Sequence, residues 1–304
     1  ISYTEKMEGI IDSLKTGKSA MIDSWFLMSS PVPIFTVVCV YIVFVIVGPR
    51  VMKSRPKLKL DTIIMYYNAF QVLLSVLLCY KALSLNLFAT GVIRAGCTYG
   101  VSSTDALLLD LGWWYFFAKV TELLDTVFFI VRKKEKQVTF LHVYHHGTMA
   151  LYAWSYLKFA AAGEGAILAL LNSAVHVVMY SYYFLAGLGP RYQKYLWWKK
   201  YVTTLQMMQF LIMLFYNFVT YNSSICDYDV NFTTFISFNI SVFLFLFYNF
   251  YSSSYKKETN DNSYSKCLSN DVQNGCYKSC DNNKLDKSPK NSNGLLNKRL
   301  IRSL

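Results

Sequence analysis

The chain has 304 residues, of which 54% are hydrophobic and 17% aromatic, and its mean hydropathy is positive. This composition excludes a soluble globular protein, because several apolar runs approach the ~20 residues that cross a bilayer. The formal net charge is +12, but the lysines and arginines fall in short loops between the apolar runs. That distribution is typical of membrane topology and argues against a nucleic-acid partner.

Seven apolar runs follow one another, and we predict that each is a transmembrane helix. The first begins at Val32, after mixed residues that include Trp25 and Phe26 as an interfacial anchor, so we expect no cleavable signal peptide. The predicted spans are residues 32–47, 62–83, 106–131, 138–159, 165–188, 201–220 and 232–251. The sequence therefore predicts an N-terminal segment (1–31), a seven-span membrane domain (32–251) and a disordered basic tail (252–304).

The distribution of positive charge predicts the orientation of the spans. The loops after the first, third and fifth spans carry five, four and four lysines and arginines, whereas the other loops carry little besides Arg94. Under the positive-inside rule, the basic loops and the tail face the cytosol. We therefore expect the N-terminal segment to be luminal and the C-terminus to be cytosolic.

Four predicted spans carry polar side chains at helical spacing, so each set shares one face of its helix. These faces lie at similar depth in the cytosolic half, and we expect them to converge. Ionisable groups at membrane depth are expensive and usually face a protein interior or a wet cavity, so the histidines predict a functional site. The four sets are Lys119, Glu122, Asp125 and Thr126; His142, His145 and His146; Asn172, His176, Tyr180 and Tyr183; and Thr203, Gln206 and Gln209.

Purely structural roles are open for part of this set. Lys119 and Glu122 fit an intramembrane ion pair as well as they fit catalysis. Gln206, Gln209 and Asn172 fit hydrogen bonds between packed helices. Three histidines on one face, with a fourth at similar depth, are more than packing needs.

Several chemistries suit such a histidine cluster. Four histidines are too few for a two-iron site, whereas a single zinc needs three ligands and an open position, so a zinc-dependent lipid hydrolase is an alternative. A metal-free site would use a neutral imidazole as nucleophile or base. A seven-span receptor or transporter is a third, non-enzymatic alternative.

The residues themselves resemble the four signature boxes of the very-long-chain fatty acid elongase family. The similarity runs from about Asp23 to Lys257 and rests on Lys119-x-x-Glu122-x-x-Asp125-Thr126, His142-Val143-Tyr144-His145-His146, Asn172-x-x-x-His176-x-x-Met179-Tyr180-x-Tyr182-Tyr183 and Thr203-x-x-Gln206-x-x-Gln209. The resemblance implies an endoplasmic-reticulum 3-ketoacyl-CoA synthase that condenses acyl-CoA with malonyl-CoA. It also implies an all-α polytopic fold in which spans two to seven form a barrel around an acyl tunnel, with the first span outside.

The resemblance further implies roles for these residues. No cysteine lies in spans three to six, so His145 is the expected acyl carrier, and His176 is expected to assist decarboxylation or to polarise a carbonyl. His142 and His146 would orient this pair, and Glu122 or Asp125 would set the histidine tautomers. A ternary complex without covalent acylation stays open. The expected substrate-binding residues are Lys119, Asn172, Tyr180, Tyr183, Gln206, Gln209 and, against the anionic CoA head, Lys199 and Lys200.

The same reading implies no metal and no cofactor beyond the two CoA substrates. The expected partners are membrane lipid and the ketoacyl-CoA reductase, dehydratase and enoyl-CoA reductase of the elongation cycle, with a homo-oligomer left open.

The predicted topology places Cys97 and Cys226 in luminal loops. The lumen is oxidising, and the other five cysteines fall in spans or in the tail. We therefore predict a disulfide between Cys97 and Cys226.

Overall fold

The computed structural model describes residues 20–85, 106–160, 163–223 and 230–256, and all regular structure in these ranges is helical. This confirms the all-α prediction for the described part of the chain. The chain divides into two compact units, residues 1–244 and 245–304. The predicted Cys97–Cys226 disulfide and most of the predicted tail lie outside the described residues.

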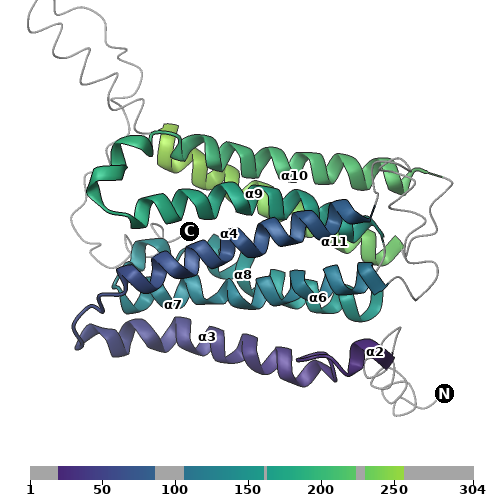
Figure 1. Cartoon of the computed structure of the whole chain (residues 1–304), viewed down its shortest axis with the longest axis horizontal. Coiled ribbons are helices and arrows are strands. Elements are labelled where there is room, and N and C mark those ends of the chain that lie inside the picture. The colour runs from purple at the N-terminus through teal and green to yellow at the C-terminus, as the bar shows by residue number, and fades with distance from the viewer. Residues whose placement is uncertain (1–19, 86–105, 161–162, 224–229, 257–304) are drawn as a thin grey trace, which may run out of the picture. The chain divides into compact units, whose positions relative to one another are not determined.

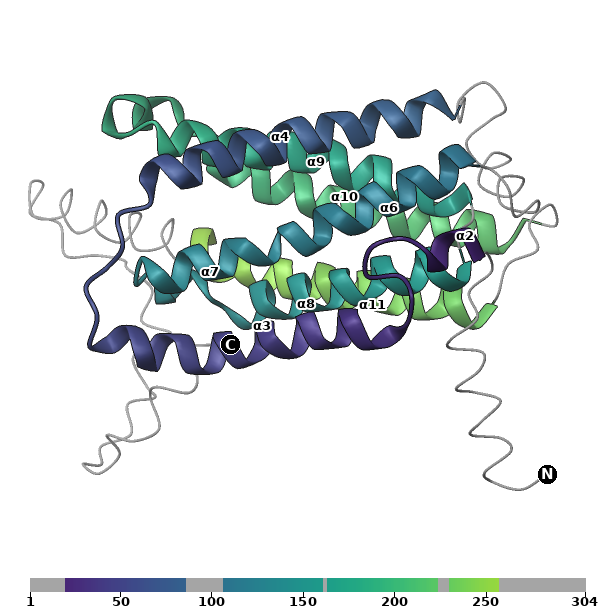
Figure 2. The same ribbon diagram turned by 60° about the horizontal axis from the view of Figure 1, so that its bottom comes forward.

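Within residues 20–244, the long helices run side by side along roughly one direction (Figures 1 and 2). The α-helices are α2 (Ala20–Asp23), α3 (Pro31–Lys53), α4 (Asp61–Ser84), α6 (Ala106–Thr121), α7 (Leu123–Val131), α8 (Phe140–Ser155), α9 (Gly163–Gly187), α10 (Lys199–Tyr221) and α11 (Val230–Tyr251). Short 3₁₀ segments are η1 (Glu135–Gln137) and η3 (Pro190–Tyr195), and π-helical turns are η2 (Tyr156–Ala160) and η4 (Ser252–Lys256). The second unit holds the end of α11 and η4.

Five helices in the described ranges are long and apolar enough to cross a membrane. They are α3, α4, α9, α10 and a stretch that begins in α11, and they match the first, second, fifth, sixth and seventh predicted spans. The chain is therefore a multi-pass membrane protein. The count of seven spans and the barrel arrangement stay predictions.

The third and fourth predicted spans are interrupted. Glu122 separates α6 from α7, and the Asp125 amide bonds the Glu122 carbonyl at 3.2 Å, an i→i+3 contact that tightens the turn. The structure is helical on both sides of this residue, over residues 106–121 and 123–131, which together match the third predicted span. The fourth predicted span changes from α-helical to π-helical geometry at Tyr156, and such turns are frequent at functional sites.

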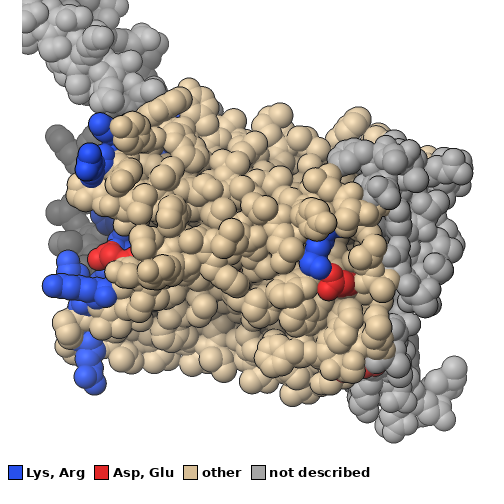
Figure 3. Space-filling view, viewed as in Figure 1, with Lys and Arg blue, Asp and Glu red and all other residues tan. Residues whose placement is uncertain are grey.

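The end of the first unit where α3 leads into α4 is strongly basic. Figure 3 shows lysines and arginines gathered at this end, whereas most of the visible side of the helices carries no charge. The Leu58 amide bonds the Val131 carbonyl at 3.1 Å, and the Lys133 ammonium bonds the Lys53 carbonyl at 3.4 Å. The α3–α4 loop and the end of α7, two of the predicted cytosolic loops, are therefore joined.

The N-terminal segment folds back onto α8 instead of only lying at an interface. The Trp154 indole donates to the Leu27 carbonyl at 3.0 Å, and Leu27 adopts a φ of 63° at this bend. Trp25 packs against the buried core cluster that contains Trp154, whereas Phe26 is exposed. Of the two aromatic residues expected to lie at the membrane interface, only Phe26 is left exposed.

Candidate active site

A ladder of three buried polar pairs joins α6 and α7 to α9. Because the partners recur every three residues on α6 and α7 and every four on α9, each set lies on one helix face. The polar faces predicted for the third and fifth spans therefore meet. The pairs are Lys119 with Asn172 (2.7 Å), Glu122 with His176 (3.1 Å) and Asp125 with Tyr180 (2.7 Å).

Lys119 and Glu122 form a buried ion pair at the first step of this ladder. The Lys119 ammonium lies 2.9 Å and 3.2 Å from the two Glu122 oxygens, and each residue is only 2% exposed. Asn172 accepts from this ammonium and from the Tyr115 hydroxyl at 3.0 Å. Buried charges persist when they are paired and hydrogen-bonded, and this pair meets both conditions.

Glu122 also sets the hydrogen position on His176. Its Oε1 atom faces Nδ1 of His176, and a carboxylate only accepts, so Nδ1 carries the hydrogen. The Nε2 atom of the neutral ring then has the lone pair that a base or nucleophile needs. Of the two carboxylates expected to set tautomers, Glu122 contacts a histidine, whereas Asp125 binds Tyr180.

The three histidines of α8 lie together, as their spacing predicts. The ring of His146 lies 4.3 Å from that of His142 and 5.4 Å from that of His145, centroid to centroid. The Nδ1 atom of His146 is buried and has no hydrogen-bond partner among the described residues. An unsatisfied buried group of this kind calls for an explanation, and a bound ligand is one.

Two hydroxyl groups in series, which we call the Tyr41 relay, hold the His142 ring. Its Nε2 atom lies 2.9 Å from the Thr126 hydroxyl, which lies 3.0 Å from the Tyr41 hydroxyl. Tyr41 belongs to α3, the span expected outside the barrel, and sequence reasoning did not select it. A tyrosine in an apolar run gives no periodic signal of its role, so only the packing of α3 against α7 and α8 reveals it.

We expect Tyr41→Phe to destabilise the protein by about 1 kcal/mol, because the buried Thr126 hydroxyl loses a partner. The measurement is the free energy of unfolding in mixed micelles. Tyr66→Phe is the matched control, since Tyr66 is 68% exposed, and it should change stability by less than about 0.5 kcal/mol. Equal effects of the two variants would show that the relay contributes nothing.

His145 faces a cavity between α8, α9, α10 and α11. The lining of this cavity is mostly apolar, with Asn172 and Gln209 among the few polar groups. Phe243, which lines the same cavity, lies against the imidazole, with ring centroids 5.0 Å apart. An apolar cavity with a few convergent polar groups is the usual form of a small-molecule site.

Other residues predicted for the site lie around it or away from it. Gln206 contacts the Met179 sulfur at 3.3 Å, and Tyr183 is 40% exposed. Lys199 and Lys200 are exposed at the start of α10, at the chain's basic end. Tyr115, which sequence reasoning missed, lies four residues before Lys119, and that helical spacing was a usable signal.

The histidines do not converge as metal ligands do. In the part of the chain that the structure describes, no three His, Cys, Asp or Glu side chains are placed to hold a metal ion. His176 faces a carboxylate, His142 faces a hydroxyl and His145 faces the cavity. This arrangement does not fit the three convergent ligands of a catalytic zinc.

Comparison with known proteins gives one consistent family. The ELO family, described as the GNS1/SUR4 family, matches residues 26–263. Very long chain fatty acid elongase 7 of Rattus norvegicus is 41% identical over 240 residues, which cover 78% of this chain and 85% of the relative. An Aedes aegypti very long chain fatty acid elongase is 39% identical over 260 residues, covering 84% and 71%. Human very long chain fatty acid elongase 4 is 36% identical over 275 residues, covering 90% and 87%.

Proposed function

Because this chain belongs to the ELO family and is an enzyme of fatty acid elongation, we propose that it condenses a long-chain acyl-CoA with malonyl-CoA. The products are CO₂, free CoA and a 3-ketoacyl-CoA that is two carbons longer. The observation that carries this proposal is the position of His145 on a mostly apolar cavity beside Asn172 and Gln209. Such a cavity suits a reactive carbonyl at the head of a hydrocarbon chain.

In the first step, a ring nitrogen of His145 attacks the thioester carbonyl of the acyl-CoA. A carbon–nitrogen bond forms, the carbon–sulfur bond breaks, and CoA leaves with the proton that the imidazole gives up. Covalent catalysis of this kind divides one difficult step into two easier ones. His146, whose ring lies against that of His145, has a buried Nδ1 available to a ligand.

In the second step, malonyl-CoA loses CO₂, and the electron pair of the broken bond attacks the acyl carbon. A carbon–carbon bond forms, the bond to His145 breaks, and the imidazole regains a proton from solvent. His176, held by Glu122 at Nδ1, takes a proton from solvent on Nε2 and then donates to the carbonyl oxygen on which negative charge develops. A single ternary complex, without the acyl-imidazole, is the alternative order of these events.

The proposal also covers the number of spans, their orientation and the partner enzymes. α6 with α7 would extend about 39 Å and α8 with η2 about 31 Å at ~1.5 Å per residue, enough to cross the ~30 Å hydrocarbon core. We therefore propose seven spans in the endoplasmic reticulum membrane, with α3 beside a barrel of the others, a luminal N-terminus and a cytosolic C-terminus. CoA would meet the basic end that carries Lys199 and Lys200. The reductase, dehydratase and enoyl-CoA reductase of the cycle would act next.

The test is an assay of the purified chain with malonyl-CoA and a panel of acyl-CoAs. Mass spectrometry should detect a malonyl-CoA-dependent 3-ketoacyl-CoA two carbons longer than the substrate. A receptor or transporter would bind acyl-CoA without forming this product. Essential, stoichiometric metal in the purified protein, with activity lost in a chelator, would favour the zinc hydrolase instead.

The covalent step has its own measurement. Acyl-CoA alone should release free CoA and leave the acyl mass on the peptide that contains His145. CoA release that requires malonyl-CoA, with no acylated peptide, would establish the ternary order.

A further inference from the structure

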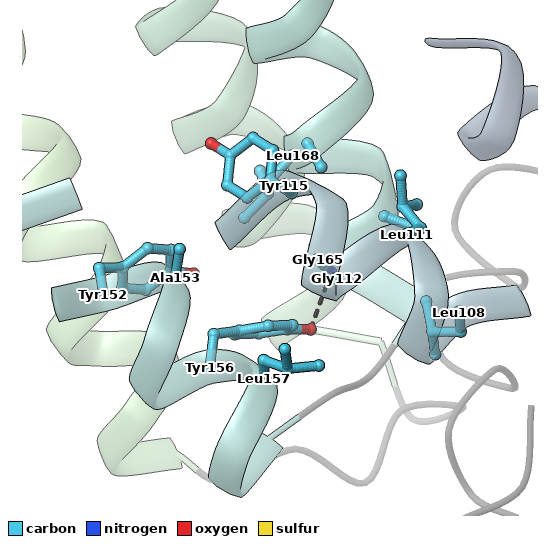
Figure 4. A pocket seen from close by; sticks show the side chains of 12 residues that line it. Leu108, Leu111, Gly112, Tyr115, Tyr152, Ala153, Tyr156, Leu157, Gly165 and Leu168 are labelled. Atoms are coloured by element: carbon cyan, nitrogen blue, oxygen red, sulfur yellow. Dashed lines mark hydrogen bonds between the residues drawn. The ribbon is translucent and has the colours of Figure 1, made fainter. Parts of the chain in front are cut away.

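A second cavity adjoins the first, farther from the basic end. It lies between α6, α8, η2 and α9 (Figure 4). Three residues, Tyr115, Tyr152 and Leu168, line both cavities. These shared residues form the boundary between the two cavities, so an acyl chain that starts at His145 would reach the second cavity by passing between them.

Tyr156 and Leu157 lie on the α8 side of this second cavity, beyond Tyr152. The Tyr156 hydroxyl accepts a hydrogen bond from the Gly165 amide at 2.9 Å, which holds the ring across the gap between η2 and α9 (Figure 4). A Cβ atom at Gly165 would lie 2.2 Å from the Tyr156 ring, and one at Gly112 would lie 2.9 Å from Leu157. Because glycine has no Cβ atom, the Tyr156 and Leu157 side chains fit against these two positions.

Contacts with the N-terminal segment also hold η2, the segment that carries Tyr156. Lys158 is fully buried, donates to the Met28 carbonyl at 2.8 Å and pairs with Asp23. Met28 belongs to the same core cluster as Leu157. A buried ammonium that loses such partners is costly, so the N-terminal segment holds η2 in place.

We propose that Tyr156 limits the length of the acyl chain that this protein accepts. The inference rests on the proposed condensation, since it assigns the far end of the same acyl site. His145 and Tyr156 are both on the α8–η2 segment and are separated by roughly 16 Å at ~1.5 Å per residue. The chain grows in two-carbon steps, so its methyl end meets the anchored Tyr156 ring once it has filled both cavities.

The test compares Tyr156→Ala with Tyr156→Phe on saturated acyl-CoAs that differ by two carbons. The alanine variant should extend the longest chain accepted by at least one step. Turnover just beyond the wild-type limit should rise roughly tenfold relative to shorter chains, because one methylene in an apolar pocket changes rates about 10–200-fold. Tyr156→Phe keeps the ring and should keep the wild-type limit.

Two further measurements keep this proposal separate from the condensation itself. Thermal stabilisation by acyl-CoA alone should extend to longer chains in Tyr156→Ala even if no condensation product forms in any variant. Leu168→Phe narrows the boundary between the cavities. It should shorten both the longest chain that is condensed and the longest chain that stabilises the protein. This variant provides the test if Tyr156→Ala does not fold. An unchanged limit in both readouts, or an equal loss at every chain length, would overturn the proposal.

Discussion

Replacing His145 with alanine is expected to lower the rate of condensation by about 10³-fold or more, because the proposed acyl carrier is removed. CoA release from acyl-CoA alone should disappear with it. His176→Ala should lower condensation by about 10²–10⁴-fold, the usual contribution of a positioned acid or base, and yet retain CoA release. Rates of CoA release and of 3-ketoacyl-CoA formation, measured side by side, separate the two roles.

Tyr144→Phe is the matched control for these histidine variants. Tyr144 precedes His145 but does not itself line the cavity, and the variant removes only its hydroxyl, which contacts the lining residue Asn239 at 3.3 Å. This control should retain condensation within a few-fold, with an unfolding temperature close to that of the wild type. An active His145→Ala variant would refute the covalent role of that residue.

Removing the Glu122 carboxylate is expected to cost about 3–5 kcal/mol of stability, because the Lys119 ammonium is left buried without its counter-charge. Glu122→Gln is the variant to measure, and its free energy of unfolding in mixed micelles gives the result. The double variant Lys119→Met with Glu122→Gln removes both charges and should recover most of the loss. It should not recover condensation, because His176 no longer faces a carboxylate.

Asp61→Asn is the control for this ion pair. Asp61 pairs with Arg132, but its side chain is 68% exposed, and exposed pairs contribute about 0–1 kcal/mol. The control should therefore change stability by less than about 1 kcal/mol. Recovery of condensation in the double variant would mean that Glu122 acts only through the ion pair and not through His176.

Sequence patterns alone predicted a helical, multi-pass membrane protein that resembles the elongase family. Apolar runs locate membrane helices because the bilayer has a fixed thickness, and five of the seven predicted runs match helices of spanning length. Helical periodicity also placed His142, His145 and His146 on one face, because the α-helix repeats every 3.6 residues. The four boxes were specific enough to indicate the family, which the comparisons confirm.

Which polar faces touch follows only from the packing of the helices. Periodicity gives the face of each helix but not its neighbours, so the pairing of Glu122 with His176 and of Asp125 with Tyr180 depends on how α6 and α7 pack against α9. The Tyr41 relay has the same origin, since an isolated tyrosine has no pattern. The turn at Glu122 and the π-helical geometry at Tyr156 were not predicted either, because neither position has the proline or glycine that usually marks an irregularity in a helix.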